Sequence, residues 1–516
     1  MSERLLETIR RRTPGLLVGS TAFVFHIFIG LLHGGPVAVP DVSAYLAVSQ
    51  WLYGGLLPEN LAFHPGYGLL LAPFGWLSGE YLHSTALVVN GAIAALCVPV
   101  GVRLATMFGA DQRTQWVSAI FIAASPCLAL SSRIAWPETL LTLVLLSTTV
   151  LVHNRRWDWA GALAGLVVVV HPRTIVLAIA LLLVAFGDRD KLIRLVQGLI
   201  PSLGLTAGLL TVTDTWPVAR IYNATTLDTG PDPIATLMGQ WLAIVAATGG
   251  IAALGFYIAL RSVPWHHRCD AKAFLGVSAL GMFLLGAWTL AGSGRVDTLL
   301  YGRYIAPWTL VLTLVGLVAI TKSNVGRSSC VVILISVLVA VTVCLAAASE
   351  TSEPVRRIMT LELGIFWYGL NENLNFILLS VALVGCASIL SFRRGPLIPL
   401  IILGLIAIPS TWVNHQHLHN VGQIAEGQVT SAKLLPDQTV CLAHDVSSKH
   451  YSLWLYRLYL PKIEHQRVDL QKGTAPCGNY VIAGTEALKF CEGAEMITKE
   501  PRASWGLWTY PTQGCG

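Results

Sequence analysis

The stretch GLLVGSTAFVFHIFIGLLHGGPVAVPDVSAYLAVSQWLYGG, residues 15–55, joins an uncharged apolar run to a half-apolar segment headed by one acid, Asp41. Residues 15–33 are close to the roughly 20 apolar residues that a helix needs to cross a bilayer. After Asp41, side chains such as Val42 and Tyr45 fall on one helical face, a pattern typical of a helix in the membrane interface. The stretch therefore predicts a spanning helix followed by an interfacial one.

The rest of the 516-residue chain is equally apolar. Hydrophobic residues make up 54% and charged residues 12%, whereas soluble proteins carry about 25% charged residues. Mean hydropathy is +0.63. We expect an α-helical polytopic membrane protein with about thirteen transmembrane helices, at 15–33, 82–106, 115–131, 137–152, 158–170, 174–187, 195–213, 236–260, 272–291, 304–321, 329–348, 374–391 and 396–412.

Basic residues indicate the orientation of these helices. They gather in alternate connections, for example at Arg155–Arg156 and Arg393–Arg394, which predicts a cytoplasmic N-terminus in the plasma membrane. No small-residue cleavage site follows the first apolar run, so we expect it to be retained. Basic inner loops account for the sequence pI near 8.8 without a nucleic-acid partner. The transmembrane domain is then 1–412, in contact with the lipid bilayer.

Residues 413–516 have lower hydropathy and are expected outside the cytoplasm as a small α/β domain. TVCLAHDV (439–446), KIEHQRVDL (462–470) and NYVIAG (479–484) read as strands, and KHYSLWLYRLYL (449–460) as an amphipathic helix. Four of the ten cysteines lie here, which suggests two disulfides. Of three connectivities we favour the pairs Cys477–Cys491 and Cys441–Cys515.

The acidic residues indicate where chemistry could occur. None lies in the middle of an expected span, which argues against an ion-coupled transporter. The acids gather instead at the outer boundary of the membrane: Asp41, Glu59, Glu80, Glu138, Asp214, Asp228, Asp232 and Asp297. The first outer loop, 34–81, which holds three of them, is longer than a connection requires.

Three stretches carry a resemblance to a known family. The early outer-loop Asp41 is followed by FHPGYGLLLAPFGWL (63–77), then by WAGALAGLVVVVHPRTIVLAIALLLVAF (159–186) and GRVDTLLYGRYIAPW (294–308). In this order they resemble the GT-C superfamily of multi-spanning glycosyltransferases, which use polyprenyl-phosphate sugars. The likeness covers the membrane part of the chain, and Asp41 is its sharpest match.

The resemblance implies transfer of a sugar from a polyprenyl-phosphate donor to an extracytoplasmic glycan or glycolipid. Asp41 would then be the general base that takes the acceptor's proton, although an acid at a helix start also serves as an ordinary cap. Cations would stabilise the leaving phosphate, and the candidates are Arg303, Arg173, His171 and Arg295. Candidates for binding the substrate or acceptor are Tyr45, His64, Arg133 and Glu138.

Several points stay open in the sequence. Arg133 and Glu138 are also read as a structural ion pair, and Arg295 as a partner of Asp297. A lone Asp41 replaces the acidic pair of some relatives, so no cofactor is certain and a divalent metal is left open. Mannose or arabinose is expected as the sugar by analogy with bacterial envelopes. The alternatives are a lipid-linked glycan polymerase or ligase, using residues 349–373, and a non-enzymatic lipid or sugar transporter.

Overall fold

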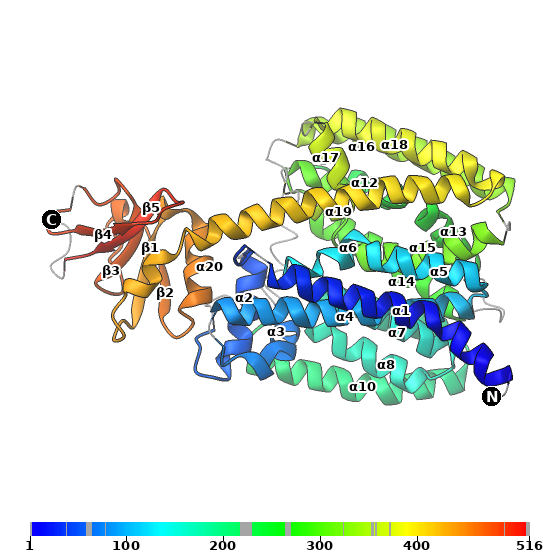
Figure 1. Cartoon of the computed structure of the whole chain (residues 1–516), viewed down its shortest axis with the longest axis horizontal. Helices are drawn as coiled ribbons and strands as arrows, with labels where there is room; N and C mark the ends of the chain where they lie inside the picture. The colour runs from blue at the N-terminus through cyan, green and yellow to red at the C-terminus, as the bar shows by residue number, and fades with distance from the viewer. Residues whose placement is uncertain are drawn as a thin grey trace.

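The computed structural model describes residues 3–511 apart from 33, 38, 58–63, 78, 217–229, 264–269, 323–324, 352–355, 357–358, 371–372 and 490, and without the side chains of 3–12 and 450. A bundle of long helices carries a small sheet domain at one end (Figure 1). We call this end of the bundle the domain end and the opposite end, where the N-terminus lies, the far end.

Each of the thirteen expected spans coincides with a helix or a helix pair. Seven of the described helices are long and apolar enough to cross a membrane, or up to nine spans with two bent pairs counted. The seven are α1 (Glu3–Leu31), α4 (Gly79–Met107), α10 (Arg189–Val212), α14 (Asp270–Leu290), α16 (Arg327–Ala347), α18 (Leu374–Ser391) and α19 (Leu397–Glu426). Four shorter apolar helices are α7 (Glu138–His153), α8 (Trp157–Leu166), α9 (Ile175–Ala185) and α15 (Ala306–Thr321).

The bent pairs differ from the straight spans expected. α5 (Gln112–Ala124) and α6 (Pro126–Ala129) meet at 50°, and α12 (Pro233–Thr248) and α13 (Ile251–Arg261) at 119°. The sharper bend lies at Gly249 and Gly250, whose φ angles of 56° and 79° are left-handed. Glycine adopts such angles without the strain of a Cβ. The prediction of one straight helix over 236–260 is therefore wrong, because the segment forms two helices that meet at a sharp bend.

Small residues allow α8 and α10 to pack backbone to backbone. A Cβ on Gly161 would overlap the Leu195 carbonyl, and a Cβ on Gly198 would overlap the Asp158 carbonyl. Glycine at such positions lets membrane helices approach closely. This contact explains the glycine-rich stretch in the sequence and fixes the short helices that lead to the functional site.

The first long connection forms α2 (Pro40–Trp51), α3 (Gly66–Leu71) and the 3₁₀ turn η1 (Ala72–Phe74). All residues of α2 from 42 to 50 are buried. This differs from the expected helix with one apolar face in the interface. The reason is that α3 packs on α2 from one direction and α20 (Lys449–Tyr459) of the C-terminal domain from another.

The C-terminal domain is an α/β unit, as the sequence predicts. Its five-stranded sheet has the order β2-β1-β3-β5-β4. β1 pairs in parallel with β2 and β3, whereas β5 pairs antiparallel with β3 and β4. The strands are β1 (Cys441–Asp445), β2 (Glu464–Val468), β3 (Tyr480–Gly484), β4 (Glu495–Lys499) and β5 (Trp505–Thr509). The last two strands were not foreseen from the sequence. Helix α19 runs through the expected boundary at 412 as far as Glu426.

The disulfide pairing expected in this domain is wrong. Cys441 is bonded to Cys477, with a Cα–Cα distance of 5.9 Å. Cys441 starts β1, and Cys477 lies just before β3, the parallel neighbour of β1. The two cysteines therefore lie at the same end of adjacent strands. Cys491 is disulfide-bonded as well, and Cys515 lies outside the described residues.

Candidate functional site

Four charged side chains meet at the domain end of the bundle. Asp41 lies in the first turn of α2, Glu138 opens α7, and Arg173 lies in the 3₁₀ turn η4 (Pro172–Thr174). Arg303 comes shortly before α15. The first three each follow a proline, a residue favoured at helix starts because its fixed φ suits the first turn. Helix starts from distant parts of the chain thus converge here.

These four residues, which we call the charge array, alternate in sign. Arg303 Nη1 lies 2.7 Å from Asp41 Oδ2, and Arg303 Nε lies 2.7 Å from Glu138 Oε1. The same Glu138 oxygen lies 3.2 Å from Arg173 Nη2. Hydrogen bonds between ionised groups at these distances are among the strongest in proteins. The order Asp41–Arg303–Glu138–Arg173 therefore forms one connected unit.

The members of the charge array differ in accessibility. The side chains of Arg303, Glu138 and Arg173 are 5%, 4% and 4% exposed, whereas that of Asp41 is 24% exposed. Buried charges persist when they are paired and hydrogen-bonded. Asp41 is therefore the member that a molecule arriving from solvent can reach, and the other three form its buried support.

Aromatic rings hold both guanidinium groups in place. Arg303 Cζ lies 3.9 Å from the ring centroid of Trp136, and Arg173 Cζ lies 4.5 Å from that of Tyr304. Such cation–π contacts favour the charged form in a desolvated site. The backbone of Arg303 also donates to the Met359 carbonyl at 3.1 Å. Trp136 and Tyr304 were not among the predicted site residues, although each lies one or two positions from one that was.

Some polar groups of the array have no partner among the described residues. They are Nε and Nη1 of Arg173 and Oε2 of Glu138, all buried. A buried donor or acceptor without a partner costs about 1–3 kcal/mol. Two unpaired guanidinium N–H groups on one buried arginine are suited to bind the oxygens of an anion.

Three further predicted residues lie close to the array. The rings of His64 and His171 are 5.1 Å apart, and His171 lies 6.1 Å from Tyr304. His171 Nδ1 also accepts a hydrogen bond from the Arg173 amide at 3.3 Å. Tyr45, one turn after Asp41, is buried edge to face against another tyrosine. The structure thus brings Tyr45, His64 and His171 next to the charges.

Two predicted residues are engaged elsewhere. Arg133 donates to His415 Nδ1 at 3.1 Å and to the Leu32 carbonyl at 3.3 Å. It makes no ion pair with Glu138, because Glu138 points into the bundle toward Arg303. Arg295 pairs with Asp297 at 3.0 Å, the alternative read from their spacing. Glu59 and Asp228 lie outside the described residues.

Side chains that could bind a metal do not cluster in the described part of the chain. No group of three or more His, Cys, Asp or Glu residues has a suitable arrangement there. Both carboxylates of the charge array are already bound to arginine. Whether a divalent metal takes part therefore stays an open prediction.

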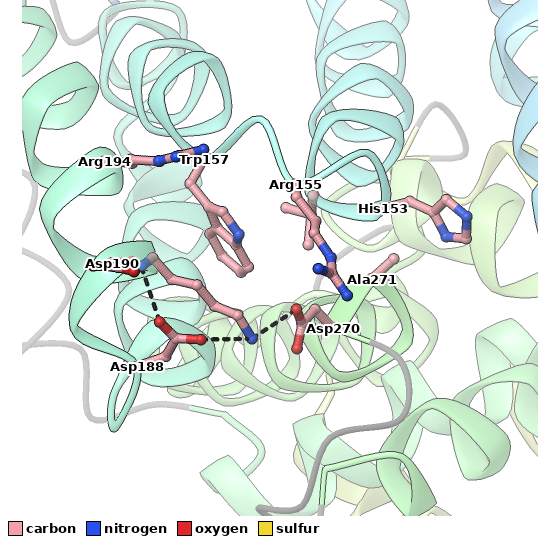
Figure 2. A pocket seen from close by; sticks show the side chains of 10 residues that line it. His153, Arg155, Trp157, Asp188, Asp190, Arg194, Asp270 and Ala271 are labelled. Carbon is pink, nitrogen blue, oxygen red and sulfur yellow. Dashed lines mark hydrogen bonds and ion pairs between the residues drawn. The ribbon is translucent and has the colours of Figure 1, made fainter.

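A separate cavity of about 560 Å³ lies at the far end. Figure 2 shows its lining, with Trp157, Arg155 and the aspartates around it. Lys191 Nζ lies 2.9 Å from Asp270 and 3.5 Å from Asp188. Helix α7, about 24 Å long at 1.5 Å per residue, runs from Glu138 in the charge array to His153 at this cavity. The acidic and basic side chains that line the cavity balance each other. The cavity therefore offers no excess positive charge for binding phosphate.

Comparisons with known proteins agree with this architecture. No family model matches the chain, and no curated protein matches it. Among solved structures, the crystal structure of ArnT from Cupriavidus metallidurans bound to undecaprenyl phosphate is similar, with a TM-score of 0.58 and 14% identity. The match covers 96% of this chain and 98% of that one. The apo structure of the same protein gives a TM-score of 0.54 and 14% identity over 95% and 97%. The chain therefore has the same overall fold as this ArnT structure, and its charge array lies at the domain end.

Proposed function

We propose that the protein is an integral-membrane glycosyltransferase that moves a sugar from a polyprenyl-phosphate donor to an extracytoplasmic glycan or glycolipid. The charge array is the observation that carries this proposal. It combines one accessible carboxylate with two buried arginines, at the end of the bundle that carries the C-terminal domain. A structure with the same fold was solved with undecaprenyl phosphate bound, which supports a lipid-phosphate donor.

Asp41 is the proposed general base. Its Oδ2 accepts from Arg303, whereas no described residue donates to Oδ1. That oxygen is therefore available for the hydroxyl of an acceptor. The proton moves from the hydroxyl to Asp41 as the acceptor oxygen bonds to the anomeric carbon. The ion pair with Arg303 also fixes the orientation of this carboxylate.

Arg173 and Arg303 are the proposed ligands of the donor phosphate. When the bond between the anomeric carbon and the phosphate oxygen breaks, that oxygen takes the electron pair and negative charge develops on the lipid phosphate. Arg173 offers Nε and Nη1, and no described residue accepts from Nη2 of Arg303. Donors fixed in advance at the developing charge lower the barrier because they need no reorganisation.

Glu138 is the proposed positioning residue between the arginines. One of its oxygens accepts from both guanidinium groups. Two cations close together would repel each other, and the carboxylate between them offsets this repulsion. Tyr45, His64 and His171 line the same region and are proposed to contact substrate. Arg133 and Arg295, engaged elsewhere, are not part of the proposed site.

The test uses purified protein in lipid nanodiscs with undecaprenyl phosphate that carries labelled mannose or arabinose. Release of free undecaprenyl phosphate reports cleavage of the donor even when water is the acceptor. A non-enzymatic transporter would leave the donor intact. Asp41→Asn should lower release by about 10²–10⁴-fold, the usual effect of losing a general base, while binding of undecaprenyl phosphate persists.

The matched control is Asp232→Asn. Asp232 also stands at a helix start and accepts from the Ala235 amide at 2.6 Å, a capping role that asparagine serves equally well. It should retain wild-type turnover. If Asp41→Asn folds, binds undecaprenyl phosphate and turns over the donor as the control does, Asp41 is only a structural partner of Arg303 and the proposed mechanism is wrong.

A further inference from the structure

The helix that begins at Asp41 is fastened to the C-terminal domain. Ser43, two residues after Asp41, donates from its hydroxyl to the Trp454 carbonyl of α20 at 2.8 Å. Ser43 is buried, so this hydroxyl has no access to bulk water. The partner atom lies 411 residues along the chain, in another domain.

No described side chain of its own segment holds the start of α2. Its N-cap residue is Val39, and no side chain caps the helix. Another buried serine of α2, Ser49, behaves differently, because its hydroxyl donates to Leu46 within the same helix at 2.6 Å. Ser43 therefore differs from Ser49, because its hydroxyl binds another domain and not a carbonyl of its own helix.

Two more contacts fix α20 against the same region. The amide of Leu56, just beyond α2, donates to the Pro461 carbonyl at 2.8 Å. Gly79, at the start of α4, lies so close to the Leu458 carbonyl that a Cβ would overlap it. The chain just after α2 and the start of α4 are thus both held against α20 and the residues that follow it.

Another side of α20 is fixed within the C-terminal domain, to the segment that follows α19. Tyr456 donates from its hydroxyl to the fully buried carboxylate of Glu500 at 2.5 Å. That carboxylate also accepts from the amides of Thr430 and Ser431 at 2.8 Å each. These residues directly follow α19, a long helix of the bundle. Helix α20 therefore links the start of α2 to the segment of the C-terminal domain that follows α19.

We propose that the C-terminal domain is a positioning element of the active site, and that Ser43 is the positioning residue through which it sets the place of Asp41. This inference rests on the proposed function. A base must lie within hydrogen-bond reach of the acceptor hydroxyl, and a displacement of about 1 Å can cost a factor of 10² in rate. Losing one bond at the start of α2 allows a smaller shift, for which we expect roughly a tenfold loss.

The test compares Ser43→Ala with Ser49→Ala as a matched control on the same helix. Release of undecaprenyl phosphate from its mannosyl or arabinosyl derivative gives kcat and KM, and binding of undecaprenyl phosphate is measured separately. Ser43→Ala should lower kcat about tenfold and leave KM and lipid binding unchanged. Ser49→Ala should match the wild type, and Ser43→Thr, which keeps the hydroxyl, should recover most of kcat.

A second variant acts on the far side of α20. Tyr456→Phe removes the bond to Glu500 and keeps the ring, so it should lower kcat in the same way without raising KM. If Ser43→Ala and Tyr456→Phe both match Ser49→Ala in kcat, the inference is wrong. If Asp41→Asn is fully active, the proposed function itself fails. Loss of kcat in Asp41→Asn with full activity in Ser43→Ala would overturn the positioning role alone.

Discussion

Arg303 and Glu138 are 165 residues apart in the sequence, yet Nε of Arg303 lies 2.7 Å from Oε1 of Glu138. Nη1 of the same guanidinium binds Asp41, also at 2.7 Å. One planar group therefore sets the distance between two carboxylates. A lysine carries the same charge but has no rigid fork with which to bind both of them.

Replacing Arg303 separates charge from geometry. Arg303→Ala should weaken binding of undecaprenyl phosphate at least tenfold, because a hydrogen bond to a charged group contributes about 1.5–3 kcal/mol. Arg303→Lys should recover only part of this affinity. Arg394→Ala, at an exposed arginine of the turn after α18, is the control and should bind normally. If the Ala and Lys variants bind equally weakly, the charge of Arg303 is not what matters for binding. If Arg303→Lys binds as tightly as the wild type, the planar fork of the guanidinium group is not needed.

The buried histidines of the C-terminal domain predict loss of stability in acid. His444 Nε2 lies 3.0 Å from His465 Nδ1, and His465 Nε2 lies 3.0 Å from the Leu460 carbonyl. Burial lowers the pKa of His465 to about 3 and that of His444 well below its ordinary value. Protons therefore bind the unfolded state first as the pH falls below about 6.5.

The stabilisation from these neutral histidines is complete above pH 6.5 and is lost as the pH falls toward 3. At pH 5 we expect about 2 kcal/mol less stability from His465, and a further loss in the same direction from His444. The measurement is Tm of the full chain at pH 7.5, 6 and 5. His153→Gln, at an exposed histidine, should keep the same pH profile. Because burial of Glu362 raises its pKa to about 7 and so changes stability in the opposite direction over this range, the decisive chain is Glu362→Gln. A Tm of that variant that stays constant between pH 7.5 and 5 would contradict this account.

Glu362 predicts the opposite pH dependence. It lies in the 3₁₀ turn η8 (Leu361–Leu363), and burial raises its pKa from 4.5 to about 7. A Cβ on Gly302 would lie only 2.9 Å from its Oε2. Because the unfolded state loses its proton first as pH rises, Glu362 lowers stability between pH 4.5 and 7. The cost above pH 8 is about 3 kcal/mol.

Glu362→Gln should therefore raise Tm at pH 8 and change it little at pH 5. Glu80→Gln, at an exposed glutamate in the first turn of α4, is the control and should change Tm at neither pH. An equal effect of Glu362→Gln at both pH values would mean that its carboxyl group does not titrate in this range.

The orientation expected from the basic loops predicts a labelling pattern. A cysteine introduced at the exposed Gln438, in the C-terminal domain, should react with an impermeant maleimide in intact cells. One introduced at the exposed Arg394, at the opposite end of α19, should react only after permeabilisation. Labelling of Arg394→Cys in intact cells would place the charge array on the cytoplasmic side and remove the basis for an extracytoplasmic acceptor.

Much of the fold could be predicted because hydropathy and the alternation of basic loops are local properties. All thirteen predicted spans correspond to helices or helix pairs. The bend between α12 and α13 was missed, although Gly249 and Gly250 mark it, because two glycines in an apolar run also suit a continuous helix. The burial of α2 was missed because the helix that covers it lies some 400 residues further along the chain.

The sequence named the four residues of the charge array one by one, but it did not predict which of them form ion pairs. Asp41, Glu138, Arg173 and Arg303 were each candidates, and they form the charge array. Glu138 was assigned to Arg133 because the two are close in sequence, whereas helix packing brings Arg303 to it. The disulfide of Cys441 was misassigned because the order of strands in the sheet decides it, and the spacing of the cysteines does not reveal that order.

The bond between Ser43 and Trp454 also has a consequence for how the protein is made. The two residues are 411 positions apart, and a ribosome adds about 5–20 residues per second. Roughly 20–80 seconds therefore pass between the synthesis of the first partner and that of the second. Throughout this interval Asp41 and its helix wait in the nascent chain without their final support. The support of α2 is consequently completed only late in translation, after α20 has been synthesised and can pack against it.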